Sequence, residues 1–178
     1  NQFMSYKNEF KNCLDGLFES LCDVSDWMYE NPELGFQEFK TSKYLVDYIQ
    51  KNSKSVNYPS HGLETAFDIT FGEEGPLTVI CVEYDALPEI GHACGHNIIA
   101  TASIGAGLAL KDIASKLAIR VKLLGTPAEE GGGGKIILIN EGAFEDASCS
   151  MMIHPGYEDV VNPTFTTIEQ YTVEYFGK

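Results

Sequence analysis

The sequence predicts an α/β fold with a mixed, mostly parallel sheet, and two observations support this prediction. Short apolar runs alternate with helical patterns through the second half of the chain. Three of these runs, at 77–82, 118–124 and 148–153, are each followed by side chains that bind metals or transfer protons. If the runs are parallel strands, their carboxyl ends share one edge of the sheet, where open α/β sheets bind ligands.

Two amphipathic helices are expected in the first third of the chain. Apolar residues recur at steps of three and four from Phe3 to Met28, which predicts a long helix. The segment 31–35, Asn-Pro-Glu-Leu-Gly, contains proline and glycine and should end this helix. The same spacing over 39–52 predicts a second helix.

The middle of the chain should contain two strands and a helix. Residues 65–71 alternate in polarity, and the tight connection 72–76 predicts that this strand forms a hairpin with 77–82. A helix over 98–111 is rich in alanine and glycine, so it can pack closely on a sheet. Asn97 stands where the N-cap of that helix belongs.

Predicted strands and helices continue to alternate in the C-terminal part of the chain. A strand over 118–124, a helix over 135–141 and a strand over 148–153 indicate parallel crossovers. One more strand is expected over 170–176. The hairpin in the middle of the chain would make the sheet mixed.

Composition excludes several classes of partner. The 178 residues include 26 acidic and 12 basic side chains, a net charge of −14. This charge argues against nucleic acid or an anionic membrane as a partner, and it could favour a cationic substrate. No apolar run reaches the length of a membrane span, and no signal peptide is present. Because the chain starts with Asn1 rather than Met, a removed signal stays an open alternative.

The five cysteines do not form a disulfide framework. Their number is odd, their spacing is wide, and no Cys-x-x-Cys motif occurs. Cys81 and Cys149 lie in apolar runs and are expected to be buried thiols. A reducing compartment, and hence a cytoplasmic location, is the resulting expectation.

Cys94 and His96 lie two residues apart in a loop that Gly91 and Gly95 allow to turn sharply. A thiolate and an imidazole at this spacing can both reach one pair of metal ions. The alternative is that His96 and the nearby His92 are ordinary surface histidines.

Glu129 and Glu130 directly follow a predicted strand. Adjacent carboxylates repel each other, so one is usually paired with a cation or has a raised pKa. A metalloenzyme can use such a pair as one ligand and one general base, and the alternative is a solvated acidic turn. The four glycines at 131–134 favour a site. A phosphate-binding loop is rejected, because the GKS or GKT ending is missing and the carboxylates would repel phosphate.

Asp85 and His154 each follow a predicted buried strand. A carboxylate at position 85 can orient a metal-bound histidine through a hydrogen bond. His154 is held by Pro155, although a single histidine at a strand end is more often structural. Each cluster has an ordinary structural explanation, but all of these explanations would have to be true at the same edge of the sheet. The meeting of the clusters at that edge therefore favours a hydrolytic metal centre.

Several motifs resemble the M20 family of metallopeptidases and amidohydrolases. They are Glu-Tyr-Asp-Ala-Leu-Pro at 83–88, His-Ala-Cys-Gly-His-Asn at 92–97 and the segment 125–135, and 31–36 resembles the family's first helix-breaking motif. The resemblance runs over about residues 27–178 and is strongest to the group of Xaa-Arg and β-alanyl-lysine dipeptidases.

This resemblance implies a three-layer α/β/α catalytic domain, an inserted lid and dimerisation domain, and two divalent metal ions. Zinc is expected, with manganese or cobalt as alternatives. By position, Cys94 resembles the ligand that bridges the metals. His96 and His154 resemble ligands of one metal, and Glu130 resembles a ligand of the other.

The resemblance also implies the reaction. Glu129 resembles the general base that activates the attacking water, and Asp85 resembles the carboxylate that orients a ligand. The expected activity is hydrolysis of a dipeptide, with a basic C-terminal residue as one candidate. The expected partners are a small peptide or N-acyl amino acid, and a second copy of the full-length protein.

Some features depart from the family pattern. Many relatives have Asp where Asn97 stands and His where Asn31 stands, and the dipeptidase-like group tolerates Asn at position 97. The family's last ligand histidine lies far toward its C-terminus. Residues 1–170 are therefore expected to be the N-terminal part of the catalytic domain and 171–178 the start of the lid, with this chain alone inactive.

Three other functions compete with the dipeptidase. An aminoacylase-like amidohydrolase would use the same site. A non-catalytic protein that retains the fold is disfavoured, because drift would be expected to erase some catalytic residues. A papain-like hydrolase with Cys94 as nucleophile gives no role to Glu129 and Glu130, and a chelator would distinguish it.

Overall fold

The computed structural model describes residues 2–167, 169 and 171–177. The helices are α1 (Gln2–Glu30), α2 (Phe39–Asn52), α3 (His96–Leu110) and α4 (Gly134–Asn140), with a short 3₁₀ helix, η1 (Ser115–Leu117). The strands are β1 (Phe67–Phe71), β2 (Leu77–Val82), β3 (Arg120–Gly125) and β4 (Ala147–Met151). Within the described residues, no helix combines the length and the apolarity that crossing a bilayer requires.

The four strands form one mixed sheet in the order β1-β3-β2-β4. β2 pairs in parallel with both β3 and β4, whereas β1 pairs antiparallel with β3. The carboxyl ends of β2, β3 and β4 therefore share one edge, as the alternating pattern predicted.

The predicted hairpin between β1 and β2 is wrong, because β3 lies between them. The connection 72–76 contacts the start of β3, where the Arg120 N–H donates to the carbonyl of Pro76 at 2.9 Å. Gly72 and Gly75 have positive φ angles of 83° and 89°. A Cβ atom on either glycine would lie about 2 Å from a carbonyl oxygen of residues 118–119. These glycines make room for a third strand rather than closing a two-strand turn.

Three other predictions need correction. Cys149, which was expected to be a buried thiol, is exposed on β4. The N-cap of α3 is Gly95 in the left-handed conformation, not Asn97, which lies inside the first turn. The Asn97 amide instead donates to the Ser25 hydroxyl at 3.0 Å and links α3 to α1. The strand predicted over 170–176 is absent from the described residues 171–176, and Gln170 lies outside the described residues.

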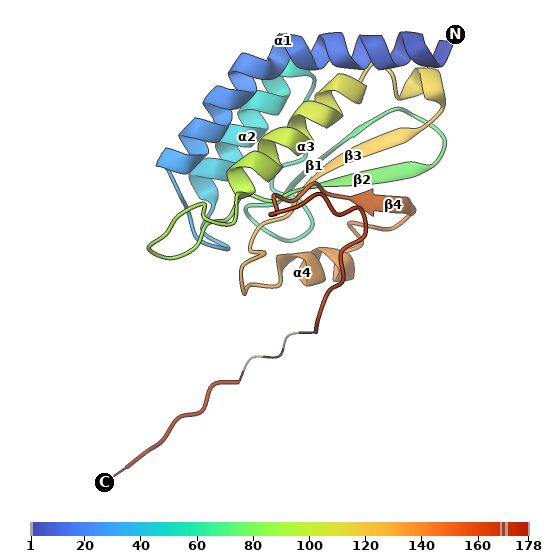
Figure 1. Ribbon diagram of the computed structural model, residues 1–178. Helices are drawn as coiled ribbons and strands as arrows, with labels where there is room; N and C mark the ends of the chain where they lie inside the picture. The colour runs from blue at the N-terminus through green and yellow to red at the C-terminus, as the bar shows by residue number, and fades with distance from the viewer. Residues whose placement is uncertain (1, 168, 170, 178) are drawn as a thin grey trace.

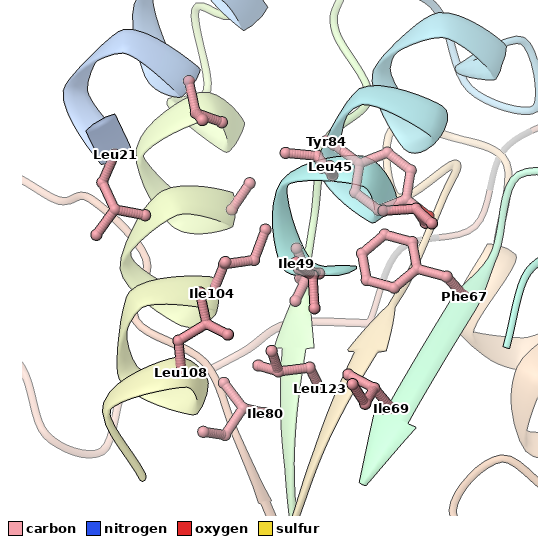
Figure 2. Close-up of a cluster of buried hydrophobic side chains, with 14 of the residues drawn as sticks. Leu21, Leu45, Ile49, Phe67, Ile69, Ile80, Tyr84, Ile104, Leu108 and Leu123 are labelled. Carbon is pink, nitrogen blue, oxygen red and sulfur yellow. The ribbon is translucent and has the colours of Figure 1, made fainter. Parts of the chain in front are cut away.

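Three layers are present, and Figure 1 shows α1, α2 and α3 on one face of the sheet and α4 on the other. Figure 2 shows the larger core, in which side chains from three helices meet those of the strands. Its labelled members are Leu21, Leu45, Ile49, Phe67, Ile69, Ile80, Tyr84, Ile104, Leu108 and Leu123. A Cβ atom on Gly107 of α3 would lie 2.5 Å from the Leu123 side chain, so a small residue is needed where this helix crosses the sheet.

A second, smaller core lies under α4. It contains Leu138 of that helix with Val79, Cys81 and Leu124 of the sheet. The sheet is thus buried on both faces in its centre, as expected for an α/β/α fold.

Candidate metal centre

In the segment after β2, alternate side chains lie on opposite sides of the backbone. Tyr84 is fully buried in the larger core, and its hydroxyl donates to the Thr65 carbonyl at 2.6 Å. Glu83 and Asp85, on either side of it, are each only 1% exposed. Because strand-like backbone alternates, both carboxylates lie on the side that faces the start of α3.

His96, the first residue of α3, lies at the centre of the site and is fully buried. Its Nδ1 atom is 3.0 Å from Oδ1 of Asp85. Its Nε2 atom is 3.3 Å from Oε2 of Glu83. The same Nε2 lies 3.8 Å from Oε2 of Glu129 and 3.7 Å from Oε1 of Glu130. One buried imidazole is therefore surrounded by four carboxyl groups.

The charges of His96 and Asp85 stabilise each other. Burial alone would raise the pKa of Asp85, but hydrogen bonds from His96 and from the Glu130 N–H lower it. Burial alone would lower the pKa of His96, but its hydrogen bond to Asp85 and the charge of Glu83 raise it. Without a cation, the geometry therefore favours an imidazolium beside an ionised Asp85, and a cation at Nε2 would replace that proton.

Glu129 and Glu130 follow β3 on a loop and differ in exposure. The Glu129 side chain is 42% exposed and the Glu130 side chain 25% exposed. Burial, followed by the charges of Glu83 and Glu130, raises the pKa of Glu129. A partly exposed carboxylate with a raised pKa suits a proton acceptor.

Cys94 lies against Glu130. Its hydrogen bond to that carboxylate, with smaller contributions from burial and other charges, raises the pKa of the thiol to about 11. Only a nearby cation would make the thiolate the stable form, because a coordinating thiol loses its proton.

His154 approaches the site from the end of β4. Its ring is nearly perpendicular to that of His96, with 6.2 Å between the ring centroids. Pro155 packs on Gly95, where a Cβ atom would lie 2.9 Å from the proline ring. Cys94 and His154 both line a cavity of about 530 Å³.

The donor atoms fit divalent cations. The Nε2 atom of His96 and Oε2 of Glu83 are buried and, within the described part of the chain, make no hydrogen bond. Buried polar atoms normally have a partner, so these two leave room for one that is not a protein group. Two sets of side chains each have their donor atoms within 4.8 Å of one another. The first set is Glu83, His96 and His154, and the second is His96, Glu129 and Glu130.

The structure brings together all six side chains that the sequence singled out. They are Asp85, Cys94, His96, Glu129, Glu130 and His154. Their chemical roles stay predictions.

Sequence reasoning missed three participants. Glu83 lies closer to His96 than any of the other three carboxylates except Asp85. Its position two residues before Asp85 is the signal that could have identified it. Lys135, in the first turn of α4, forms an ion pair with Glu83. His92 is buried rather than a surface residue, and burial lowers its pKa.

Sequence comparison found known proteins that are similar to this chain. No protein-family model matches the chain. The Xaa-Arg dipeptidase of Mus musculus is 36% identical over 93% of this chain and 42% of its own length. The N-acetyl-L-cysteine deacetylase of Bacillus subtilis (strain 168) is 26% identical over 100% of this chain and 48% of its own length.

A solved structure is also similar. The Bacillus subtilis YXEP protein, described as a dinuclear metal binding peptidase from the M20 family, superposes with a TM-score of 0.67 at 25% identity. The match covers 76% of this chain and 42% of that protein. The chain therefore spans less than half the length of these relatives.

Proposed function

Because this chain belongs to the M20 family of metallopeptidases and amidohydrolases, we propose that the protein containing it hydrolyses an amide bond with two divalent cations. One observation carries the proposal. The Nε2 atom of His96 is buried without a hydrogen bond and faces Glu83, Glu129 and Glu130.

We assign the metal-binding side chains as the resemblance to the M20 family implies, and the two donor sets support the choice of His96, His154 and Glu130. His96 and His154 would hold one cation, with Glu83 within reach of it, and Glu130 would hold the other. Cys94 would lie between them, since its thiol contacts Glu130. Zinc suits a set of imidazole, thiolate and carboxylate donors, and manganese or cobalt are the alternatives. Bound here, the cations would polarise the scissile carbonyl and acidify the attacking water.

The protein's own groups would move the protons. Glu129 would accept a proton from the attacking water and deliver it to the leaving amine. Its partial exposure and raised pKa support this role. Asp85 would accept the hydrogen bond from Nδ1 of His96 and thereby keep Nε2 directed at the cation.

The proposed substrate is a dipeptide with a basic C-terminal residue. The relative named as an Xaa-Arg dipeptidase supports this choice, and the net charge of −14 would attract a cationic substrate. Hydrolysis of an N-acyl amino acid is the second candidate, supported by the relative named as an N-acetyl-L-cysteine deacetylase. We further propose a homodimer and a cytoplasmic location for the full-length protein, with a domain boundary near residue 171.

Chelation tests the proposal. The full-length protein should lose hydrolysis of Xaa-Arg and Xaa-Lys dipeptides in a chelator and recover it when zinc, manganese or cobalt is added. N-acetyl amino acids assayed in parallel separate the two substrate classes. Turnover that persists after the metal content has been shown to be zero would contradict the proposal and would favour Cys94 as a nucleophile.

A further inference from the structure

The segment 31–38 contacts both loops that carry the candidate metal centre. The carbonyl of Glu33 accepts the Ala86 N–H at 2.8 Å, directly after Asp85. A Cβ atom on Gly35 would lie 3.0 Å from Cα of Ala128, directly before Glu129. This helix-breaking segment therefore packs where the two loops meet.

Glu38, at the end of that segment, is a fully buried carboxyl group. Its Oε1 atom accepts the Ala128 N–H at 2.7 Å, and its Oε2 atom accepts the Thr65 hydroxyl at 3.2 Å. A buried carboxyl group is costly unless its oxygens have such partners. Neither partner is a residue of the candidate centre, so the position of Glu38 needs another explanation.

Ala128 has a conformation that alanine rarely adopts. Its φ angle is +56°, in the left-handed region, and the residue is fully buried. Its carbonyl accepts the Gly134 N–H at 3.1 Å while its own N–H donates to Glu38. Such backbone strain persists only where the surroundings hold it, and it is common at functional sites.

Two carboxyl groups therefore bind alternate N–H groups of one short segment. Glu38 binds the N–H of Ala128, and Oδ2 of Asp85 binds the N–H of Glu130 at 2.8 Å. Glu129 lies between these two points, and its Oε2 atom is 3.8 Å from Nε2 of His96. The direction of the Glu129 side chain depends on the backbone that the two carboxyl groups hold.

We propose that Glu38 is a positioning residue, which holds the left-handed Ala128 through its N–H and so directs the Glu129 carboxylate toward the reacting water. This role rests on the proposed function of Glu129. Glu38 itself touches neither the substrate nor the cations.

Three variants of the full-length protein test this role. Glu38→Met has a similar length but no hydrogen-bond acceptor. Glu38→Gln keeps an acceptor for the Ala128 N–H, and its amide can donate to the Thr65 hydroxyl. Glu64→Met, on an exposed neighbour of Thr65, is the matched control. The readouts are kcat, KM, bound metal, and hydrogen exchange of the Ala128 amide.

We expect Glu38→Met to lower kcat by roughly 10–100-fold, the usual effect of removing such a supporting group, with KM and the metal content nearly unchanged. The Ala128 amide should exchange faster in this variant. Glu38→Gln should restore both kcat and amide protection, and Glu64→Met should behave as the wild type.

Wild-type kcat in Glu38→Met, or an equal loss in Glu38→Gln, would overturn the proposal. If Glu38→Met does not fold, Glu38→Asp is used in its place. The aspartate side chain is one methylene shorter, so its carboxylate does not reach the Ala128 N–H. Full kcat in Glu38→Asp would then overturn the proposal. Hydrogen exchange at Ala128 needs no substrate, so the hydrogen bond is tested even if the wild type proves to hydrolyse no amide.

Discussion

Nδ1 of His96 lies 3.0 Å from Oδ1 of Asp85, and both side chains are buried. The other oxygen of Asp85 accepts the Glu130 N–H at 2.8 Å. One carboxylate thus orients a candidate ligand on α3 and also fixes the backbone of a candidate ligand on the loop after β3. The relationship couples two segments that are far apart in the sequence.

Asp85→Asn should weaken cation binding. An amide offers one acceptor oxygen in place of two, so either His96 or the Glu130 N–H loses its partner. We expect metal affinity to fall by about 10–100-fold, as for other partners of metal-bound histidines. A competition titration with a chromogenic chelator measures this change, and unchanged affinity would show that His96 needs no orienting carboxylate.

Cation binding should release a proton from His96. The pKa of His96 is raised, so the folded, metal-free protein holds this proton more tightly than the unfolded chain does. The His96–Asp85 contact therefore stabilises the metal-free fold at low pH, and this contribution is lost as pH rises through the raised pKa. Metal affinity should rise over the same interval, since the cation and the proton compete for Nε2. Calorimetric titration in buffers of different ionisation enthalpy counts the released protons.

Glu129→Gln separates metal binding from proton transfer. The amide cannot accept the water's proton, so kcat should fall by about 10²–10⁴-fold. The two cations should remain bound, because Glu129 is assigned no metal in the proposed arrangement. Metal analysis and turnover of the same preparation give both values. Near-normal turnover would remove Glu129 from its role as base.

Lys135→Met tests the ion pair with Glu83. The Lys135 side chain is 29% exposed and the Glu83 side chain only 2% exposed, so removing the lysine takes one of its two cationic neighbours from a buried carboxylate and leaves only His96. The Tm of the metal-free protein should fall. Added zinc should raise Tm more than in the wild type, because the bound cation replaces the lost charge.

Lys43→Met is the matched control for this comparison, since Lys43 pairs with Asp47 on the exposed face of α2. Surface pairs of this kind contribute little to stability, so its Tm should barely change. If zinc raises Tm by the same amount in the wild type, Lys135→Met and Lys43→Met, Glu83 does not face the cation.

Local patterns were sufficient to predict most of the elements and the clustering of the site. Hydrophobic periodicity placed α1, α2 and the central strands, and parallel strands necessarily bring their carboxyl ends to one edge. The pairing of β1 could not be predicted, because a short connection with glycines is typical of a hairpin. The observed pairing depends on Gly72 and Gly75, because the absence of a Cβ atom at both positions lets the start of β3 lie against this connection.

The roles of Glu83 and Glu38 depend on contacts that no local pattern reports. Glu83 directly follows the predicted strand 77–82, and no local pattern assigned it a role in the site. Glu38 lies 90 residues from Ala128 in the sequence, and only the folded chain brings the two together. An isolated glutamate directly before an amphipathic helix would ordinarily be interpreted as a surface residue.

The buried carboxyl group of Glu38 should give the protein a distinctive dependence of stability on pH. Burial is the largest cause that raises its pKa, from 4.5 to about 7. Between these two values the folded state binds more protons than the unfolded chain, so the free energy of unfolding falls as pH rises. A shift of this size corresponds to roughly 3 kcal/mol when each pKa unit contributes 1.36 kcal/mol.

Glu38→Gln isolates this contribution, because the amide does not titrate while it keeps the acceptor for Ala128. Chemical denaturation of both proteins at several values between about pH 5 and pH 8 gives the two curves. The wild type should lose stability relative to Glu38→Gln as pH rises, while other titrating groups cancel in the difference. Parallel curves would show that Glu38 is ionised throughout this range, and that its hydrogen bonds to Ala128 and Thr65 outweigh the cost of burying the charge.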